Sequence, residues 1–172
     1  PEVMSFRLLS PQALPSFNTR IRLSESQNVI ALAFSEQGQA WITQKNVRVT
    51  ISGCLMSPDE NSSSLVKMEN PRVALPRRIQ AGQPVDIRTL INHPMETGLR
   101  EAADGTRIPQ SLVQSMTVSL NNQPALEAQF NNGTSANPYV RFLIQPSSSA
   151  ELAVDWQDQQ GNTISETRAV EL

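Results

Sequence analysis

Short stretches in which apolar and polar residues alternate run along most of the chain, with turn residues between them. In the clearest of these, VDIRTLIN at 85–92, every second side chain lies on one face, as in a half-buried β-strand. Trp156 falls on the apolar side of a similar stretch, so we expect it in the core. The patterns after residue 71 predict strands at 72–75, 85–92, 112–120, 125–130, 139–144, 152–157 and 163–170. Such a series of short strands, without helical periodicity, predicts an all-β, immunoglobulin-like β-sandwich.

The first 54 residues predict a second, smaller set of strands. The stretch SPQALPS at 10–16 contains two prolines and predicts a loop. The continuous apolar run at 29–34 predicts a segment that is buried on both faces or lies between two sheets. The remaining strand patterns lie at 5–9, 19–23, 40–43 and 47–52. These few strands cannot close a sandwich by themselves. We therefore expect that further strands were lost from the N-terminus, that another chain supplies them, or that this segment packs on the C-terminal half.

Residues 55–71, LMSPDENSSSLVKMENP, separate these two halves. Serine, asparagine, proline and acidic residues dominate the stretch, and its few aliphatic side chains cannot offset the entropy of ordering. We therefore expect a flexible linker there. The predicted organisation is a partial sandwich at 1–54, the linker at 55–71 and a complete sandwich at 72–172.

Charge and composition narrow the classes of partner. The chain has 14 Lys and Arg against 16 Asp and Glu, a formal net charge of −2, and no basic run, so we expect no nucleic acid and no anionic membrane as a partner. The longest apolar run is far shorter than the roughly 20 residues that span a bilayer, which predicts a soluble protein. Without a glycine-rich phosphate loop or an alternation of strands and helices, we expect no cofactor. Proteins or small molecules are the expected partners, and a homo-oligomer that exchanges strands is one way to complete the first domain.

The only cysteine of the chain, Cys54, follows a strand pattern and Gly53. A lone cysteine forms no internal disulfide and is most often a small buried hydrophobe. Here, however, the period of two that places Val47, Val49 and Ile51 inward places Cys54 on the solvent side. The polar linker begins directly after it. We therefore expect an exposed, reactive thiol where an ordered strand gives way to a tether.

The only imidazole, His93, lies in the loop sequence HPMETG. One histidine with one cysteine makes neither a closed zinc site nor a catalytic triad. We expect a structural or docking role for His93, no metal site, and no catalytic residue on this chain.

In its longer motifs the sequence resembles the SoxYZ sulfur carriers of thiosulfate-oxidising bacteria, with the two subunits joined in one chain. Residues 19–54, which end in NVRVTISGC, resemble the C-terminal part of SoxY. Residues 72–172 resemble SoxZ along their whole length. The most similar motifs are RTLINHPMETGLR at 88–100, DGTRIP at 104–109, SANPYVRF at 135–142 and VDWQDQQG at 154–161.

This resemblance implies two immunoglobulin-like sandwiches packed together, a periplasmic location, and a cysteine that holds pathway intermediates while separate enzymes act on them. The match of TISGC to the cysteine-bearing tail of the family implies that Cys54 is the attachment residue. It also implies that Gly53 lets the backbone turn and approach an enzyme cleft. The implied partners are periplasmic sulfur-oxidation proteins, although fused carriers of this kind also occur alongside quinoprotein dehydrogenases.

Three functions are open at this point. A covalent carrier, with a thiosulfonate or persulfide on Cys54, requires an exposed thiol that alkylates readily. A non-covalent adaptor of a periplasmic quinoprotein dehydrogenase would keep its function when serine replaces Cys54. A thiol enzyme such as a sulfurtransferase would turn over without a partner, but the sequence shows no cradle of arginines or backbone amides around the cysteine. We therefore expect a carrier protein rather than an enzyme.

Overall fold

The computed structural model describes residues 2–50, 67–102 and 104–172. Within these ranges the chain forms eleven β-strands and no helix, which confirms the all-β prediction. Its contacts divide it into two compact units, Pro1–Ile21 with Ser63–Leu172, and Arg22–Ser62.

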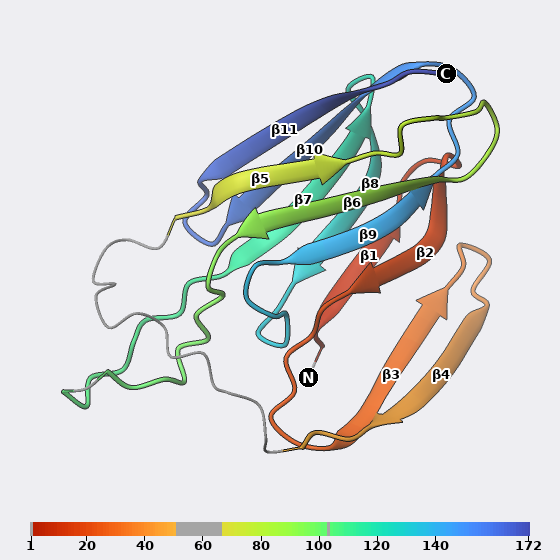
Figure 1. The fold of residues 1–172 in the computed structure, drawn as a ribbon. Coiled ribbons are helices and arrows are strands. Elements are labelled where there is room, and N and C mark those ends of the chain that lie inside the picture. The colour runs from red at the N-terminus through yellow and green to blue at the C-terminus, as the bar shows by residue number, and fades with distance from the viewer. Residues whose placement is uncertain (1, 51–66, 103) are drawn as a thin grey trace. The chain divides into compact units, whose positions relative to one another are not determined.

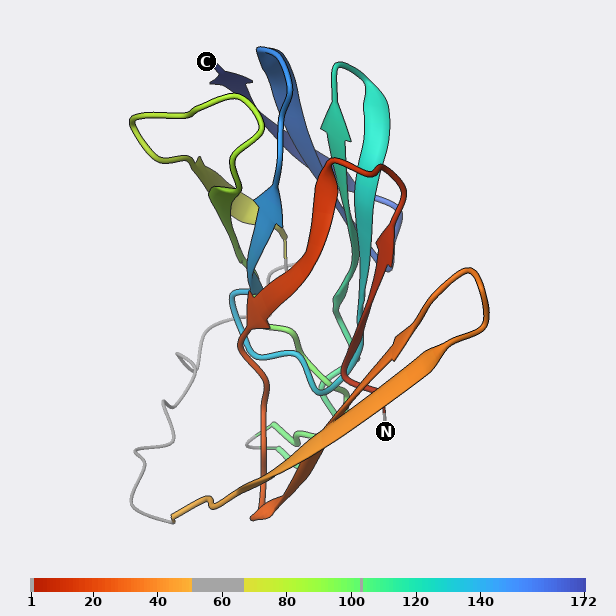
Figure 2. The ribbon, with the colours of Figure 1, turned by 90° about the vertical axis from the view of Figure 1, so that its right-hand side faces the viewer.

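The larger unit is an immunoglobulin-like sandwich of two antiparallel sheets (Figures 1 and 2). Its strands are β1 (Met4–Leu8), β2 (Ala13–Thr19), β5 (Glu69–Ala74), β6 (Val85–Asn92), β7 (Val113–Leu120), β8 (Gln123–Phe130), β9 (Tyr139–Ile144), β10 (Ala150–Asp158) and β11 (Thr163–Val170). One sheet has the strand order β1-β8-β7-β10-β11 and the other the order β2-β9-β6-β5. All seven strands predicted after residue 71 are present, with ends that shift by at most three residues.

The core of the sandwich consists of alternate residues from the two sheets. On β6 the predicted alternation is confirmed, with Ile87 and Ile91 fully buried. Thr89 is also buried. Its hydroxyl donates a hydrogen bond to the carbonyl oxygen of Val140 at 2.9 Å, so this buried polar group has a hydrogen-bond partner. Trp156 is 1% exposed, which confirms its predicted place in the core.

Strands β1 and β2 add one strand to each sheet. β1 pairs with β8 and β2 pairs with β9, while the rings of Phe6 and Phe17 stack with centroids 4.0 Å apart. The sequence predicted one partial sandwich at 1–54, but the structure groups residues 1–21 with the C-terminal strands. The physical reason is that β8 and β9 would otherwise expose unpaired backbone groups at the sheet edges.

The path of β2 corrects two expectations. The predicted loop at 10–16 is confirmed only as a turn at 10–12, and the strand begins at Ala13. It can include Pro15 because Pro15 lies where the register shifts between Leu14 and Phe17 on an edge strand. A proline at such a bulge removes no ladder hydrogen bond. The strand predicted at 19–23 is wrong, since β2 ends at Thr19.

The smaller unit contains a hairpin of β3 (Gln27–Phe34) and β4 (Ala40–Val47), joined through a turn in which Gly38 has a positive φ. The expectation that the apolar run at 29–34 is buried is wrong, because Ile30, Leu32 and Phe34 are exposed and Phe34 is 75% exposed. A two-stranded ribbon has no second sheet of its own to cover its faces.

The boundaries of the predicted linker also change. β4 ends at Val47, so the predicted strand at 47–52 does not continue the ladder over residues 48–50. On the other side, Met68 is buried in the sandwich and β5 already begins at Glu69, inside the range expected as linker. Residues 51–66 lie outside the described residues.

Replacing Phe17 by alanine should destabilise the sandwich by about 1–3 kcal/mol, because the ring is partly buried against Phe6 and its removal exposes apolar surface. Urea unfolding followed by the fluorescence of Trp156, in a Trp41→Phe background, measures this. Phe34→Ala is the matched control and should change stability by less than about 0.5 kcal/mol. Equal losses in the two variants would show that β1 and β2 do not complete the sandwich.

Candidate functional site

The predicted attachment residue Cys54 and its neighbour Gly53 lie outside the described residues, so their geometry is not part of the structure. The part of the chain that leads to them is described as far as Thr50. It forms the open end of the β3–β4 hairpin.

Side chains close this open end. The Ser26 hydroxyl accepts a hydrogen bond from the backbone N–H of Val49 at 2.8 Å, and its oxygen lies 3.3 Å from the Val49 carbonyl oxygen, to which it donates. The Asn46 amide donates to the side-chain oxygen of Asn28 at 2.9 Å. The two bonds of Ser26 hold the chain in place at Val49, two residues beyond the last strand residue, Val47, and five residues before the cysteine.

The predicted alternation persists along this stretch although the ladder has ended. Val47 and Val49 are half-buried, whereas Arg48 and Thr50 are exposed. The pattern from which the exposure of Cys54 was predicted is therefore present in the structure up to Thr50.

His93 is buried, 2% exposed, at the start of the loop after β6. Its Nδ1 accepts a hydrogen bond from the N–H of Met95 at 3.1 Å, so the neutral ring carries its proton on Nε2. Nε2 has no hydrogen-bond partner in the part of the chain that the structure describes. Burial lowers the pKa of His93, and the negative charge of Asp158 offsets this only in part. His93 is therefore a buried residue bonded to its own loop, and its expected structural or docking role stays a prediction.

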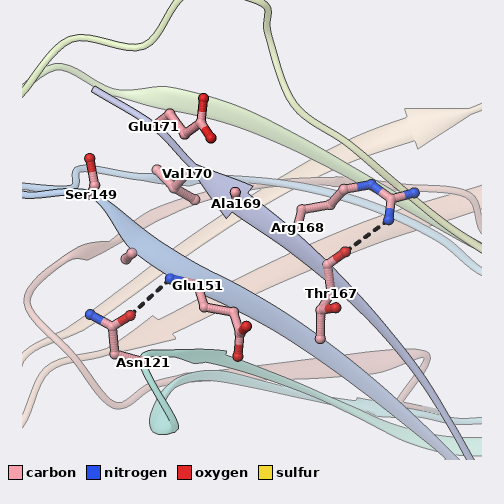
Figure 3. Close-up of a pocket in the computed structure, with 9 residues that line it drawn as sticks. Asn121, Ser149, Glu151, Thr167, Arg168, Ala169, Val170 and Glu171 are labelled. Carbon is pink, nitrogen blue, oxygen red and sulfur yellow. Dashed lines mark hydrogen bonds between the residues drawn. The ribbon is translucent and has the colours of Figure 1, made fainter.

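A surface hollow of about 410 Å³ lies at one end of β10 and β11 (Figure 3). Two of its polar side chains are engaged elsewhere, since Asn121 accepts from the N–H of Glu151 at 2.8 Å and Arg168 pairs with Glu166. Neither a thiol nor an imidazole lines it. The hollow therefore lacks the reactive thiol that the sequence predicts as the functional group.

The described residues contain no group of three or more His, Cys, Asp and Glu side chains placed to hold a metal ion. In the same part of the chain, no helix has the length and hydropathy needed to cross a bilayer.

Sequence reasoning missed a cluster of charges on the outer face of the sheet β2-β9-β6-β5. The carboxylate of Asp86 accepts from Arg141 Nε at 2.8 Å and from Arg88 Nε at 3.4 Å. Burial raises the pKa of Asp86, but hydrogen bonds and positive charge from Arg141 and Arg88 outweigh it, and the pKa is lowered. Alternation within β6 signals that Arg88 points outward, but only the register with β9 reveals that Arg141 lies opposite it.

Comparison with known families gives two matches along the chain. Residues 73–169, which hold the end of β5, all of β6–β10 and β11 except its last residue, match the family described as sulphur oxidation protein SoxZ. Residues 1–54, which hold β1–β4, match the family described as sulfur oxidation protein SoxY. No curated protein matches the chain. The SoxZ match alone covers more than half of the 172 residues, and the SoxY match ends at Cys54.

The stability of the sandwich should fall as the pH drops below about 6.5, the ordinary pKa of histidine. Because the pKa of His93 is lowered in the folded state, the unfolded chain binds a proton first and unfolding is favoured from that pH downward. The slope should approach about 1.4 kcal/mol per pH unit. Urea unfolding between pH 7.5 and pH 5 measures it.

His93→Asn is the informative variant, because its side-chain oxygen can still accept from Met95 N–H but cannot titrate. The variant should lose the slope between pH 6.5 and pH 5, whatever its overall stability. An unchanged slope would mean that other groups cause the pH dependence.

Replacing Ser26 by alanine should speed hydrogen exchange at the Val49 N–H by about fivefold, since one hydrogen bond contributes about 1 kcal/mol. Ser35→Ala is the matched control, because Ser35 accepts from the Gln39 N–H at the other end of the hairpin. It should speed exchange at Gln39 alone. Exchange measured residue by residue decides this, and no change at Val49 would contradict the anchoring.

Proposed function

Since the chain belongs to the SoxZ family of sulfur-oxidation proteins and carries a SoxY segment ahead of that region, we propose that Cys54 is its covalent attachment site for sulfur-oxidation intermediates. One observation carries the proposal: the SoxY match ends at Cys54, which is the only thiol of the chain. The chain then supplies a nucleophile, and other proteins supply the redox and hydrolytic chemistry.

Loading thiosulfate requires the Cys54 thiolate and an electron-accepting partner protein. The thiol loses its proton, its sulfur forms a bond to the outer sulfur of thiosulfate, and two electrons pass to the partner. The product is a cysteine S-thiosulfonate. Water, activated by a second partner, then cleaves the bond between the outer sulfur and the sulfonate, which releases sulfate and two protons and leaves a persulfide on Cys54.

The described residues support presentation of the thiol rather than catalysis. Ser26 holds the chain at Val49, and the five residues from Thr50 to Cys54 span at most about 18 Å even when fully extended. The sulfur therefore cannot travel far from the open end of the hairpin. The proposal makes the protein a carrier without enzymatic activity, with periplasmic sulfur-oxidation or dehydrogenase proteins as its partners.

Incubating the full chain with thiosulfate and a purified thiosulfate-oxidising partner should add the mass of one thiosulfate to the intact protein. The adduct should form because Cys54 is the only residue of the chain that can make a bond to sulfur of this kind, and a reductant should remove it. Intact mass spectrometry, followed by peptide mapping, measures both.

The Cys54→Ser variant is the control and should gain no mass. A wild-type chain that stays unmodified under these conditions would rule out the carrier function. If the Cys54→Ser variant also retained the biological activity of the wild type, a non-covalent adaptor would replace the carrier. Turnover of thiosulfate by the chain alone would instead point to a thiol enzyme.

A further inference from the structure

The outer face of the sheet β2-β9-β6-β5 carries arginines that neither the core nor the thiol requires. Along β6 and β9 the residues between the buried ones point outward, so that Arg88 lies opposite Arg141 and Leu90 lies opposite Tyr139. On the neighbouring β5, Arg72 lies opposite Leu90. The arginine face, as we call it, consists of Arg20, Arg72, Arg88, Arg141, Leu90 and Tyr139.

The positive charge of this face is only partly neutralised. Arg88 and Arg141 share the single carboxylate of Asp86, with side chains that remain about half exposed. Arg20 lies over the ring of Tyr139, 4.9 Å from its centroid, and Arg72 makes no ion pair within the described ranges. With Asp86 and Glu69 counted, four arginines against two carboxylates leave a formal charge of +2.

The outer face of the other sheet has the opposite charge. There, Arg7 stands against Glu127, Glu151 and Asp155, which leaves −2, and most other outward positions carry hydroxyl or amide groups. Of the two outer faces of the sandwich, the arginine face is thus the positive one, although the chain as a whole has a net charge of −2. Such a separation of charge orients an approaching partner.

The composition of the arginine face is that of a protein interface. Arginine and tyrosine are enriched at interfaces, and the half-buried Leu90 and Tyr139 give the face an apolar centre within a charged rim. Guanidinium groups recognise carboxylates through paired hydrogen bonds. The matching surface is therefore an acidic patch with an apolar middle.

We propose that the arginine face is the docking surface for an acidic patch on the partner protein that loads or processes Cys54, an inference that rests on the proposed carrier function. The chain has to bind such a partner because it supplies neither the oxidant nor the hydrolytic water activation that the thiol chemistry needs. A second copy of this chain is a poorer fit, because its acidic face offers hydroxyl groups in place of an apolar centre. Such stacking of unlike faces would also not close into a symmetric dimer.

Binding of the purified thiosulfate-oxidising partner to the full-length Cys54→Ser chain tests this surface without any adduct. Arg72→Glu should weaken the affinity by about tenfold, mainly through a slower association rate, because it reverses one charge of the face. The wild-type affinity should fall between 50 and 300 mM salt. Surface plasmon resonance measures both rates, and thermal unfolding verifies that each variant is folded.

The matched control is Arg7→Glu, which makes the same change of charge on the outer face of the other sheet. It should leave the affinity within about twofold of the wild type. The proposal would be overturned if Arg72→Glu and Arg7→Glu weakened the affinity equally. It would also be overturned if the partner did not bind detectably to the chain with an unsubstituted arginine face. Self-association of the chain that Arg72→Glu abolishes would overturn it in favour of a second copy.

The two proposals fail separately. If the partner binds in a way that depends on Arg72 but no sulfur is loaded onto Cys54 of the wild type, the carrier function is ruled out and the docking surface stands. Sulfur loading that is as fast in Arg72→Glu as in Arg7→Glu removes the docking surface and leaves the carrier.

Discussion

The rest of the structure depends on one constraint, the pairing of β1 and β2 with the two sheets that the C-terminal strands form. β1 covers the edge of β8 and β2 covers the edge of β9, and stacking of Phe6 on Phe17 ties the two additions together. Without them β8 and β9 would be the edge strands, whereas the edges are now formed by the five-residue β1 and by β2, which is bulged and contains a proline. The chain therefore starts in the sandwich, leaves it after Ile21, and is back in its core at Met68.

This topology changes what a carrier thiol can do. A cysteine near a chain end swings on one tether, whereas Cys54 lies in a segment whose two flanks belong to folded structure, Val49 bound by Ser26 and Met68 buried in the core. Under the proposed carrier function, the partner has to come to the thiol rather than the thiol enter the partner, and the docking surface that we propose serves that purpose.

The sequence predicted what depends on neighbours along the chain and missed what depends on the other strands. β6, β9 and β11 have the predicted bounds because alternation within one strand is a local signal. The apolar run at 29–34 was misjudged because a pattern does not reveal whether a second layer covers it. The loop predicted from Pro15 was wrong for a similar reason, since only the strand pairing shows that β2 is an edge strand. Cys54 was found from the sequence as a candidate, while the opposition of Arg88 and Arg141 required the register.

The placement of these two arginines is a cost to the fold. Like charges directly opposite each other on neighbouring strands destabilise a sheet, and here the carboxylate of Asp86 offsets that repulsion by accepting from both. A neutral residue at either position would remove the repulsion without disturbing the core, because both side chains point away from it. Neither the packing of Ile87 and Phe142 on the inner side nor the presentation of Cys54 explains the pair. Recognition of an anionic surface does explain it, because two fixed guanidinium groups bound to one carboxylate keep their outer N–H groups available for another.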